Sequence, residues 1–427
     1  MKKLLSIITA TLLTSTLCFA EIEHDYRFFE LGFDATVAAS ENALSVPEIF
    51  TKNVVIDFKK MSDSMGDEGL IVDADGNGKF FLNTKFGKNL KLGLFFDTDI
   101  SARLGLSKEI FTFLGYGNEL DAPIETTINA NAQAYAQLGF SVKSKISNFT
   151  FKVTPSYFLP VLYFPQPKDA TCTVETKSDG TITADVDATV NLYSVFDLST
   201  VFDSSLNFLG VDTIMSTITS SDSIMKILQQ GGFDLTATLE YPIFRTFDVG
   251  IYTRIPIVPA KLSNSVSASA AFSAQVDPIL DSYTSTGSLS YTTEGPTFSD
   301  VVFGTDIYSV NRPLRFGMEG AWRPFGSWCT FFPSIGFAAN NPFGDDFSWK
   351  TSLYPEYSLA ADIRIAYVLG LNLSTAYKQQ IFIQKVGVIF NARIFELDVN
   401  VASSSPNFTK SWLVSGLQAN VGVRVGF

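Results

Sequence analysis

Residues 125–146 alternate between polar and apolar side chains, with the polar ones mostly at odd positions and the apolar ones mostly at even positions. Successive side chains of a β-strand point to opposite faces, so this pattern predicts a strand with one wet face and one apolar face. The segment is far longer than the roughly 5–6 residues that are typical of strands in soluble proteins. Something apolar must cover one face over that length, and a lipid bilayer is the simplest candidate.

The same alternation recurs through the last half of the chain, and charged residues fall on the polar row each time. The segments are 233–241, 315–323, 359–374, 395–401 and 417–427. A charge on a lipid-facing row costs ~2–4 kcal/mol near the bilayer midplane, which explains why those rows carry none. Counting such stretches from Lys79 to Phe427 predicts an all-β fold, a transmembrane antiparallel β-barrel of about 14 strands and at most about 16.

Short and long connections are expected to separate the two ends of this barrel. The expected short turns are 87–89, 147–148, 245–246 and 369–370, and the expected long loops are 166–180, 207–230, 277–291 and 340–350. Two stretches have helical rather than β spacing, namely 106–114, with Ser107 as its cap, and 211–230. We expect both helices to lie in the outer loops.

The first 20 residues have the layout of a cleaved export signal. Two lysines precede an apolar stretch, and Ala20 occupies the cleavage position. A lipoprotein signal with Cys18 as the lipidated residue is the alternative. The rest of the sequence has no run of ~18 apolar residues, yet the chain is 46% hydrophobic and 14% aromatic. These features favour the outer membrane of a bacterial cell over a secreted array of β-sandwiches.

Residues 21–78 do not alternate for long, and they mix phenylalanines with small residues. We therefore expect them to form a plug in the lumen, ahead of a barrel that spans 79–427; a periplasmic tail is the alternative. The barrel should end in an amphipathic strand that closes on Phe427. Such a strand resembles the signal by which the outer-membrane assembly machinery recognises its barrels.

Charges on the polar rows predict a charged lumen. These candidate lumen residues are Arg315, Glu319, Arg323, Asp362, Arg364, Arg393, Glu396, Asp398 and Arg424. A charged lumen can act as a water-filled filter or as an ion-paired surface against a plug. The sequence leaves both open.

Composition argues against several other functions. A net charge of −12 disfavours nucleic-acid binding. His24 is the only histidine, so a Ser-His-Asp or Cys-His centre has almost no material, and we expect no enzyme activity and no cofactor. Residues 73–78 resemble the first half of a calcium loop, but Thr84 stands where the final glutamate is needed, so we expect no metal site. Cys172 and Cys329 could pair in an oxidising compartment.

The export signal, the plug-like segment, the strand number and the terminal Phe together resemble the long-chain fatty acid transporter (FadL-like) class of outer-membrane barrels. Segments 44–50 and 106–111, with Gly117 and Asn118, are similar to barrels of spirochaetes such as treponemes. The resemblance covers nearly the whole mature chain. The family's Asn-Pro-Ala motif is absent here, and Ser45-Val46-Pro47 is the nearest counterpart, so no binding residue is carried over from the family.

The resemblance implies a monomeric passive transporter, embedded in membrane lipids, for hydrophobic small molecules such as long-chain fatty acids. The expected binding residues are apolar: Phe28, Phe29 and Phe33 of the plug, and Phe111, Phe113 and Leu114 of the loop helix. Plain packing is the alternative role for these side chains. Two other functions remain open, a general porin for small polar solutes and a surface-exposed adhesin or antigen.

Overall fold

The computed structural model describes residues 27–43, 57–67, 69–167, 170–207, 209, 221–278, 291–340, 342, 347–349, 352–365, 368–378, 380–413 and 416–427. The export signal expected at residues 1–20 lies outside the described residues, and so does His24.

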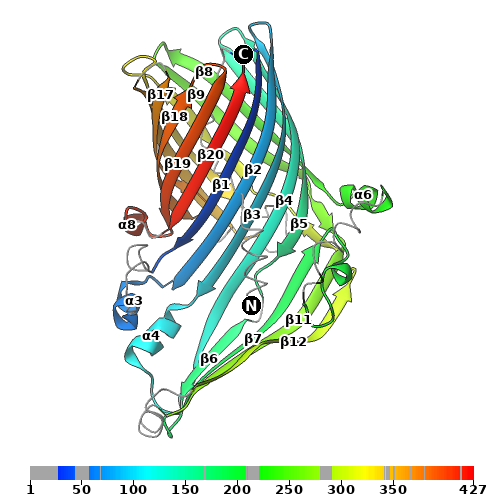
Figure 1. The fold of residues 1–427 in the computed structure, drawn as a ribbon, viewed down its shortest axis with the longest axis vertical. Coiled ribbons are helices and arrows are strands. Elements are labelled where there is room, and N and C mark those ends of the chain that lie inside the picture. The colour runs from blue at the N-terminus through cyan, green and yellow to red at the C-terminus, as the bar shows by residue number, and fades with distance from the viewer. Residues whose placement is uncertain are drawn as a thin grey trace.

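The described chain forms one antiparallel sheet of eighteen strands, fourteen of which close on themselves into a barrel (Figure 1). In ring order, the barrel strands are β1 (Phe29–Glu41), β2 (Leu70–Phe86), β3 (Leu90–Leu106), β4 (Ile124–Ile146), β5 (Phe149–Phe164), β8 (Gly232–Phe244), β9 (Phe247–Val258), β14 (Leu314–Trp322), β15 (Cys329–Ala339), β16 (Leu353–Arg364), β17 (Leu369–Lys378), β18 (Ile381–Asn391), β19 (Phe395–Ser405) and β20 (Leu417–Gly426). The ring closes because β1 pairs with β2 on one side and with β20 on the other.

The remaining four strands of the sheet extend the wall beyond the barrel on one side. They are β6 (Thr171–Thr176), β7 (Ile182–Ser194), β11 (Asn264–Val276) and β12 (Tyr291–Gly304). The extension starts where β6 pairs with the first residues of the long strand β4, and it continues through β7 and β11 to β12. A separate two-stranded sheet joins β10 (Ala260–Leu262) to β13 (Tyr308–Val310).

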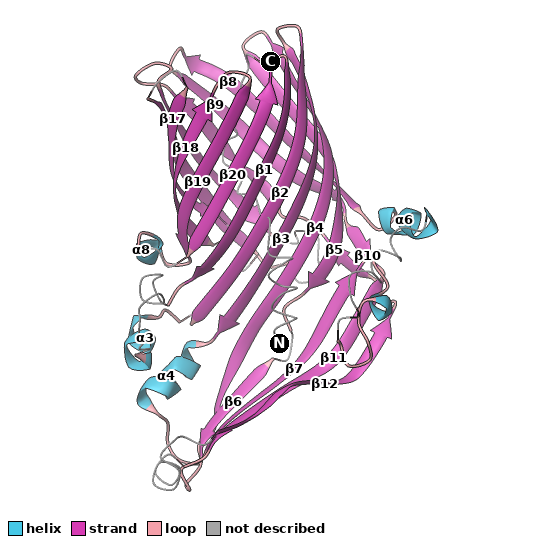
Figure 2. Ribbon diagram, in the orientation of Figure 1, coloured by secondary structure: helices cyan, strands magenta, loops and turns pink. Residues whose placement is uncertain are grey.

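Short helices lie outside the ring (Figure 2). They are α3 (Phe58–Ser64), α4 (Lys108–Tyr116), α6 (Ser221–Leu228), α8 (Phe408–Ser411) and the 3₁₀ helix η1 (Leu198–Thr200). The helix predicted at 106–114 is therefore confirmed, although the Ser107 hydroxyl makes no capping bond. The helix predicted at 211–230 is present only as α6, and residues 211–220 lie outside the described part. None of the described helices is long and apolar enough to cross a membrane.

The two ends of the barrel differ in the length of their connections. The C-terminus lies at the end where the short turns gather, and the helices and the strand extension lie toward the opposite end (Figure 1). The turns predicted at 87–89, 147–148 and 245–246 are confirmed. The turn predicted at 369–370 is wrong, because Leu369 and Gly370 already pair with β18. The apolar alternation at 359–374 continues across the connection between β16 and β17, so it does not show where either strand ends.

Side-chain alternation along the ring strands matches the prediction. In β4, Leu138 and Phe140 are 50% and 43% exposed on the outer face, whereas Gln137 and Ser141 line the interior. The same holds in β14, where Phe316 and Met318 face outward. Polar residues at alternate positions therefore form the inner wall.

The segment expected to form a plug instead contributes to the wall. Residues 29–41 form β1, and residues 70–78 form the first half of β2. β1 carries alanine on both sides of its alternation, so the contrast between its two faces is weak and the strand is hard to recognise in the sequence. Residues 21–26 and 44–56, which belong to the same expected segment, lie outside the described residues.

The two cysteines among the described residues do not pair. Cys172 lies in β6 and Cys329 in β15, and both are buried free thiols. Cys172 packs with Val174 and Phe113 in an apolar cluster beside the loop helix. Burial in that cluster raises the pKa of the Cys172 thiol, with a smaller contribution from the charge of Asp185.

Candidate functional site: the barrel lumen

The barrel encloses a cavity of about 1330 Å³. Its walls are the inward rows of the ring strands, and in β4 these rows include Gln133, Gln137 and Lys143. A closed antiparallel ring satisfies its own backbone hydrogen bonds, so these side chains rather than the backbone determine what the lumen contacts. The lumen is therefore taken as the candidate site.

One wall of the lumen is acidic. Asp73 and Asp75 on β2, with Asp97 and Asp99 on β3, all project into the cavity. Asp73 lies directly opposite Arg103 in the β2–β3 register, and the Arg103 Nε donates to Asp73 Oδ1 at 2.5 Å. The pair compensates the charge of Asp73, and the Asn77 amide donates to Asp97 Oδ1.

Residues 73–78 are a regular strand rather than a calcium loop. Asp73, Asp75 and Asn77 share the inner face because they are two residues apart, and all three stand in ladder with β3. The described residues contain no cluster of three or more His, Cys, Asp or Glu side chains that could hold a metal ion.

The small two-stranded sheet of β10 and β13 lies beside the lumen. Its strands are far apart in the sequence, and Ala260 pairs with Val310. Ala260 and Leu262 are fully buried, and Leu262 packs in an apolar cluster with Val195 and Val310. This packing fixes the position of the small sheet, and Arg312, two residues after Val310, lines the cavity.

Arg312 reaches across the inner face of several strands. Its Nη1 lies 3.2 Å from Asp234 Oδ2 on β8, and its guanidinium is 5.9 Å from the ring centre of Phe158 on β5. Its charge also acts on the carboxylates of Asp97 and Asp99 on β3. Arg312 therefore contacts side chains of β5 and β8 directly, and its charge acts on β3 from a greater distance.

Two more arginines stand opposite the acidic wall. Arg254 on β9 and Arg315 on β14 are directly paired in register, and both act electrostatically on Asp99. The Arg315 Nη2 lies 3.2 Å from Glu356 Oε1, and the Arg254 Nε donates to the carbonyl of Pro313 at 3.1 Å. At this level the cavity therefore has carboxyl groups on one side and guanidinium groups on the other.

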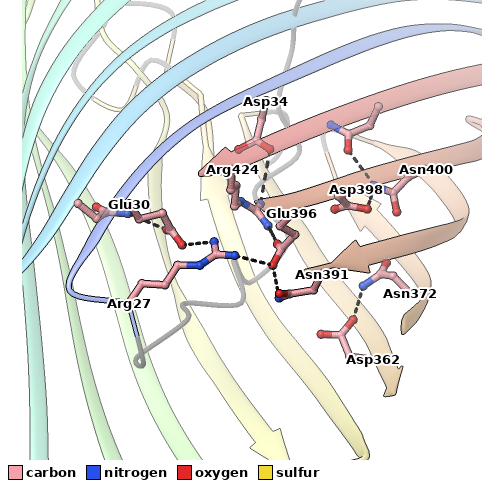
Figure 3. Close-up of polar contacts among 12 residues, drawn as sticks. Arg27, Glu30, Asp34, Asp362, Asn372, Asn391, Glu396, Asp398, Asn400 and Arg424 are labelled. Carbon is pink, nitrogen blue, oxygen red and sulfur yellow. Dashed lines mark hydrogen bonds and ion pairs between the residues drawn. The ribbon is translucent and has the colours of Figure 1, made fainter. Parts of the chain in front are cut away.

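A buried charged network closes the seam between the first and last strands (Figure 3). Glu396 on β19 is 1% exposed, and it accepts a bond of 2.6 Å from Arg424 Nη1 on β20. Arg424 Nη2 also lies 3.5 Å from Asp34 on β1, and Arg27 lies 2.7 Å from Glu30 and 3.5 Å from Glu396. The network thus joins both ends of the chain at the short-turn end.

Two further carboxylates beside this network accept hydrogen bonds from amide side chains (Figure 3). The Asn372 amide donates to Asp362 Oδ1 at 2.5 Å, and the Asn400 amide donates to Asp398 Oδ1 at 2.8 Å. These pairs line the same side of the lumen, across β16 to β19.

Most of the predicted lumen charges are in the lumen. Those that line the cavity are Arg315, Glu319, Arg323, Arg364, Asp398 and Arg424. Asp362 and Glu396 lie on the same inward rows and are held by Asn372 and Arg424. Arg393 is wrongly predicted, since it is exposed in the β18–β19 turn with φ of 71°.

The aromatic residues expected in the plug lie on the barrel wall and its rim. The rings of Phe28 and Phe29 pack against Phe427, with centroids 6.5 and 5.7 Å apart. Phe33 is on the outer row of β1, with its ring centre 4.6 Å from that of Phe80. Because they lie on the outer face or the rim, these residues do not line the lumen.

The residues expected in the loop helix are mostly packed. Phe111 contacts Met61 and Met65 of α3, whereas Phe113 packs against β6. Leu114 is 49% exposed. The Tyr116 hydroxyl donates to Asp63 Oδ1 at 2.5 Å, which ties α4 to α3 and raises the pKa of Tyr116.

The acidic wall, Arg254 and Arg312 were not among the residues expected from the sequence, whereas Arg315 was. A signal for Asp97, Asp99 and Arg103 is present, because they continue an odd-numbered polar row against Leu92, Leu94 and Phe96. Arg312 has no such signal, since it follows the short strand β13 and its position depends on the pairing of β13 with β10.

Solved structures with a related shape include several outer-membrane proteins. The toluene transporter TodX of Pseudomonas putida matches with 8% identity and a TM-score of 0.45, over 93% of this chain and 89% of that one. A FadL homologue of Pseudomonas aeruginosa matches with 8% identity and a TM-score of 0.43, over 93% and 90%. The translocator domain of the autotransporter NalP of Neisseria meningitidis matches with 7% identity and a TM-score of 0.35, over 100% and 95%.

No family profile matches the sequence, and no curated protein matches it. At these identities and TM-scores the solved structures assign neither a family nor a function to the chain. What the lumen can do therefore follows from its own geometry.

Proposed function

We propose that the protein is a passive channel in the outer membrane of a bacterium and that it carries small polar and charged solutes through its lumen. The observation that carries this proposal is the inner wall, which is lined by acidic and basic side chains around a cavity of about 1330 Å³. Burying such charges without water or partners would be costly, so a hydrated lumen suits them. The ring closes within one chain, so a monomer is sufficient for transport.

The outer face supports a position in a bilayer. Leu94, Phe96 and Leu138 are each close to half exposed on adjacent strands, and their rows carry no charge. A large contiguous apolar surface on a closed barrel is what acyl chains solvate. Short turns face the periplasm in barrels of this kind, so we orient the C-terminal end inward and leave the helices and the strand extension outside. In this orientation, β20 and Phe427 are available to the assembly machinery.

Planar-bilayer recording tests the proposal. The refolded protein should give steady conductance steps in KCl, and Arg312→Gln should raise the single-channel conductance because it replaces a lining side chain by a shorter, neutral one. Lys177→Gln, which alters an exposed loop residue, is the matched control and should leave conductance unchanged. A wild-type barrel that inserts into the bilayer but passes no current would overturn the proposal.

Transport of hydrophobic solutes, including long-chain fatty acids, is the second candidate. An aromatic stack on the small sheet of β10 and β13 supports it. Tyr308 of β13 lies between Tyr193 and Tyr163, with ring centres 4.4 and 5.3 Å away. Such a stack offers flat apolar faces to a ring or an acyl chain. Displacement of a fluorescent fatty acid from the refolded barrel tests this candidate. Tyr308→Ala should weaken binding, whereas Phe111→Asp and Phe113→Asp should weaken it only if the loop helix contributes.

A further inference from the structure

Four lysines form an unbroken row across the inner wall at the short-turn end of the lumen. Lys85 on β2 lies directly opposite Lys91 on β3, Lys91 lies opposite Lys143 on β4, and Lys143 lies opposite Lys152 on β5. All four line the cavity. The row therefore spans four adjacent strands without an intervening residue of another type.

Such a row concentrates basic side chains on one stretch of the inner wall. Directly opposed residues of antiparallel strands have Cα atoms roughly 4.5–5.5 Å apart, so neighbouring lysines of the row can act on one solute. Elsewhere the inner rows carry threonine or serine, as at Thr150 and Ser141. A row of lysines on the cavity wall therefore creates a local positive potential that such neutral residues would not.

The opposite wall carries negative charge at the same level. The Glu319 carboxylate on β14 feels the charges of Lys143, Lys152 and Lys378, together with that of Glu240 on β8. Glu240 and Glu319 both stand beside Gly250, where a Cβ atom would lie within 3.2–3.3 Å of their Cγ atoms. The potential at this level therefore rises from the β8–β14 wall toward the lysine row, and an anion is directed to the lysines.

We infer that the lysine row is a binding site for compact oxyanions that carry two or more negative charges, such as phosphate-bearing solutes. Lysine ammonium groups bind such anions as point charges from several directions. A doubly charged oxyanion can contact two neighbouring lysines at once, and a row of four offers three such positions in sequence. The inference deepens the proposed function, because it rests on solutes reaching the row through the lumen and names the class that is favoured.

Reversal potentials in a KCl gradient test the selectivity. Wild type should prefer chloride over potassium, and the quadruple variant Lys85→Gln, Lys91→Gln, Lys143→Gln, Lys152→Gln should lower that permeability ratio at least about threefold. The control variant, Lys59→Gln, Lys60→Gln, Lys177→Gln, Lys226→Gln, removes the same total charge from exposed positions in the outer loops. It should keep the wild-type ratio. A conducting channel whose ratio does not change in the lysine-row variant would overturn the inference while the proposed function stands.

Equilibrium dialysis with inorganic tripolyphosphate gives a test that does not depend on conductance. Detergent-solubilised wild type and the control variant should bind the anion, and the lysine-row variant should lose most of that binding. Absence of binding to the wild type would overturn the inference even if no current can be recorded. The lysine-row variant should also keep the heat-modifiable gel shift of a folded barrel, because the substitution relieves repulsion between like charges.

Discussion

Replacing Arg424 by glutamine should destabilise the barrel far more than the same substitution at Arg323. Both arginines donate from Nη1 to a carboxylate at 2.6 Å, Arg424 to Glu396 and Arg323 to Asp248. The two pairs differ in burial. The Arg424 and Glu396 side chains are 11% and 1% exposed, whereas those of Arg323 and Asp248 are 36% and 34% exposed. The comparison therefore isolates the effect of burial on one type of ion pair.

The magnitude follows from what each substitution leaves behind. Without Arg424, the carboxylate of Glu396 stays buried with Asn391 and the more distant Arg27, and Asp34 loses one contact, at 3.5 Å. Removing one partner of a buried pair costs about 3–5 kcal/mol. Removing one partner of an exposed pair costs about 0–1 kcal/mol, because water replaces the lost contact.

Urea unfolding of the refolded protein in lipid vesicles, followed by tryptophan fluorescence, measures both values. The double variant Arg424→Gln, Glu396→Gln should recover part of the loss, because it no longer leaves Glu396 charged. Equal losses for Arg424→Gln and Arg323→Gln would refute the argument that the seam network is energetically distinct from a surface ion pair.

Three further predictions concern the wall and the lumen. Leu138→Arg, on the outer row of β4, should cost ~2–4 kcal/mol in the same unfolding assay, and Gln137→Arg, one residue away on the inner row, should cost much less; similar costs would contradict the assigned faces. Arg312→Ala should increase the passage of a neutral sugar in liposome-swelling experiments, because a long side chain that lines the cavity is replaced by a short one. An unchanged rate would mean that Arg312 does not restrict the path. Unfolded protein prepared without reductant should show two reactive thiols, at Cys172 and Cys329, and a value of zero would indicate a disulfide.

The barrel can be predicted from the sequence where the two faces of a strand differ strongly in polarity. In β4, β8 and β20, alternate residues are apolar and the others are polar or glycine, so the pattern predicts both the strand and its faces correctly. The same contrast in β14 correctly predicts that Arg315 and Glu319 are luminal. Alternation reports the side of the wall on which a residue lies, and this information is local.

Features that depend on contacts between distant segments cannot be predicted in this way. The small sheet of β10 and β13 is held in place because Leu262 and Val310 pack on Val195, which lies more than sixty residues away. The position of Arg312 follows from that packing. The lysine row likewise needs the register of four strands, since single lysines at 85, 91, 143 and 152 have no visible relation in the sequence.

The weak alternation of β1 and the buried charged network at its edge both affect how the register of this strand is set. Outer residues such as Ala35 and Ala39 differ little from inner residues such as Ala38, so hydrophobicity alone specifies the register of this strand poorly. A slip by one residue would place Asp34 on the lipid side and take it away from Arg424. Because β1 pairs with β20 across nearly the whole length of the chain, this register must be set late and without help from a connecting turn. The charged groups around Glu396 provide the register specificity that the alternation in β1 lacks. The strand that is hardest to recognise in the sequence, β1, is therefore held in register by ion pairs.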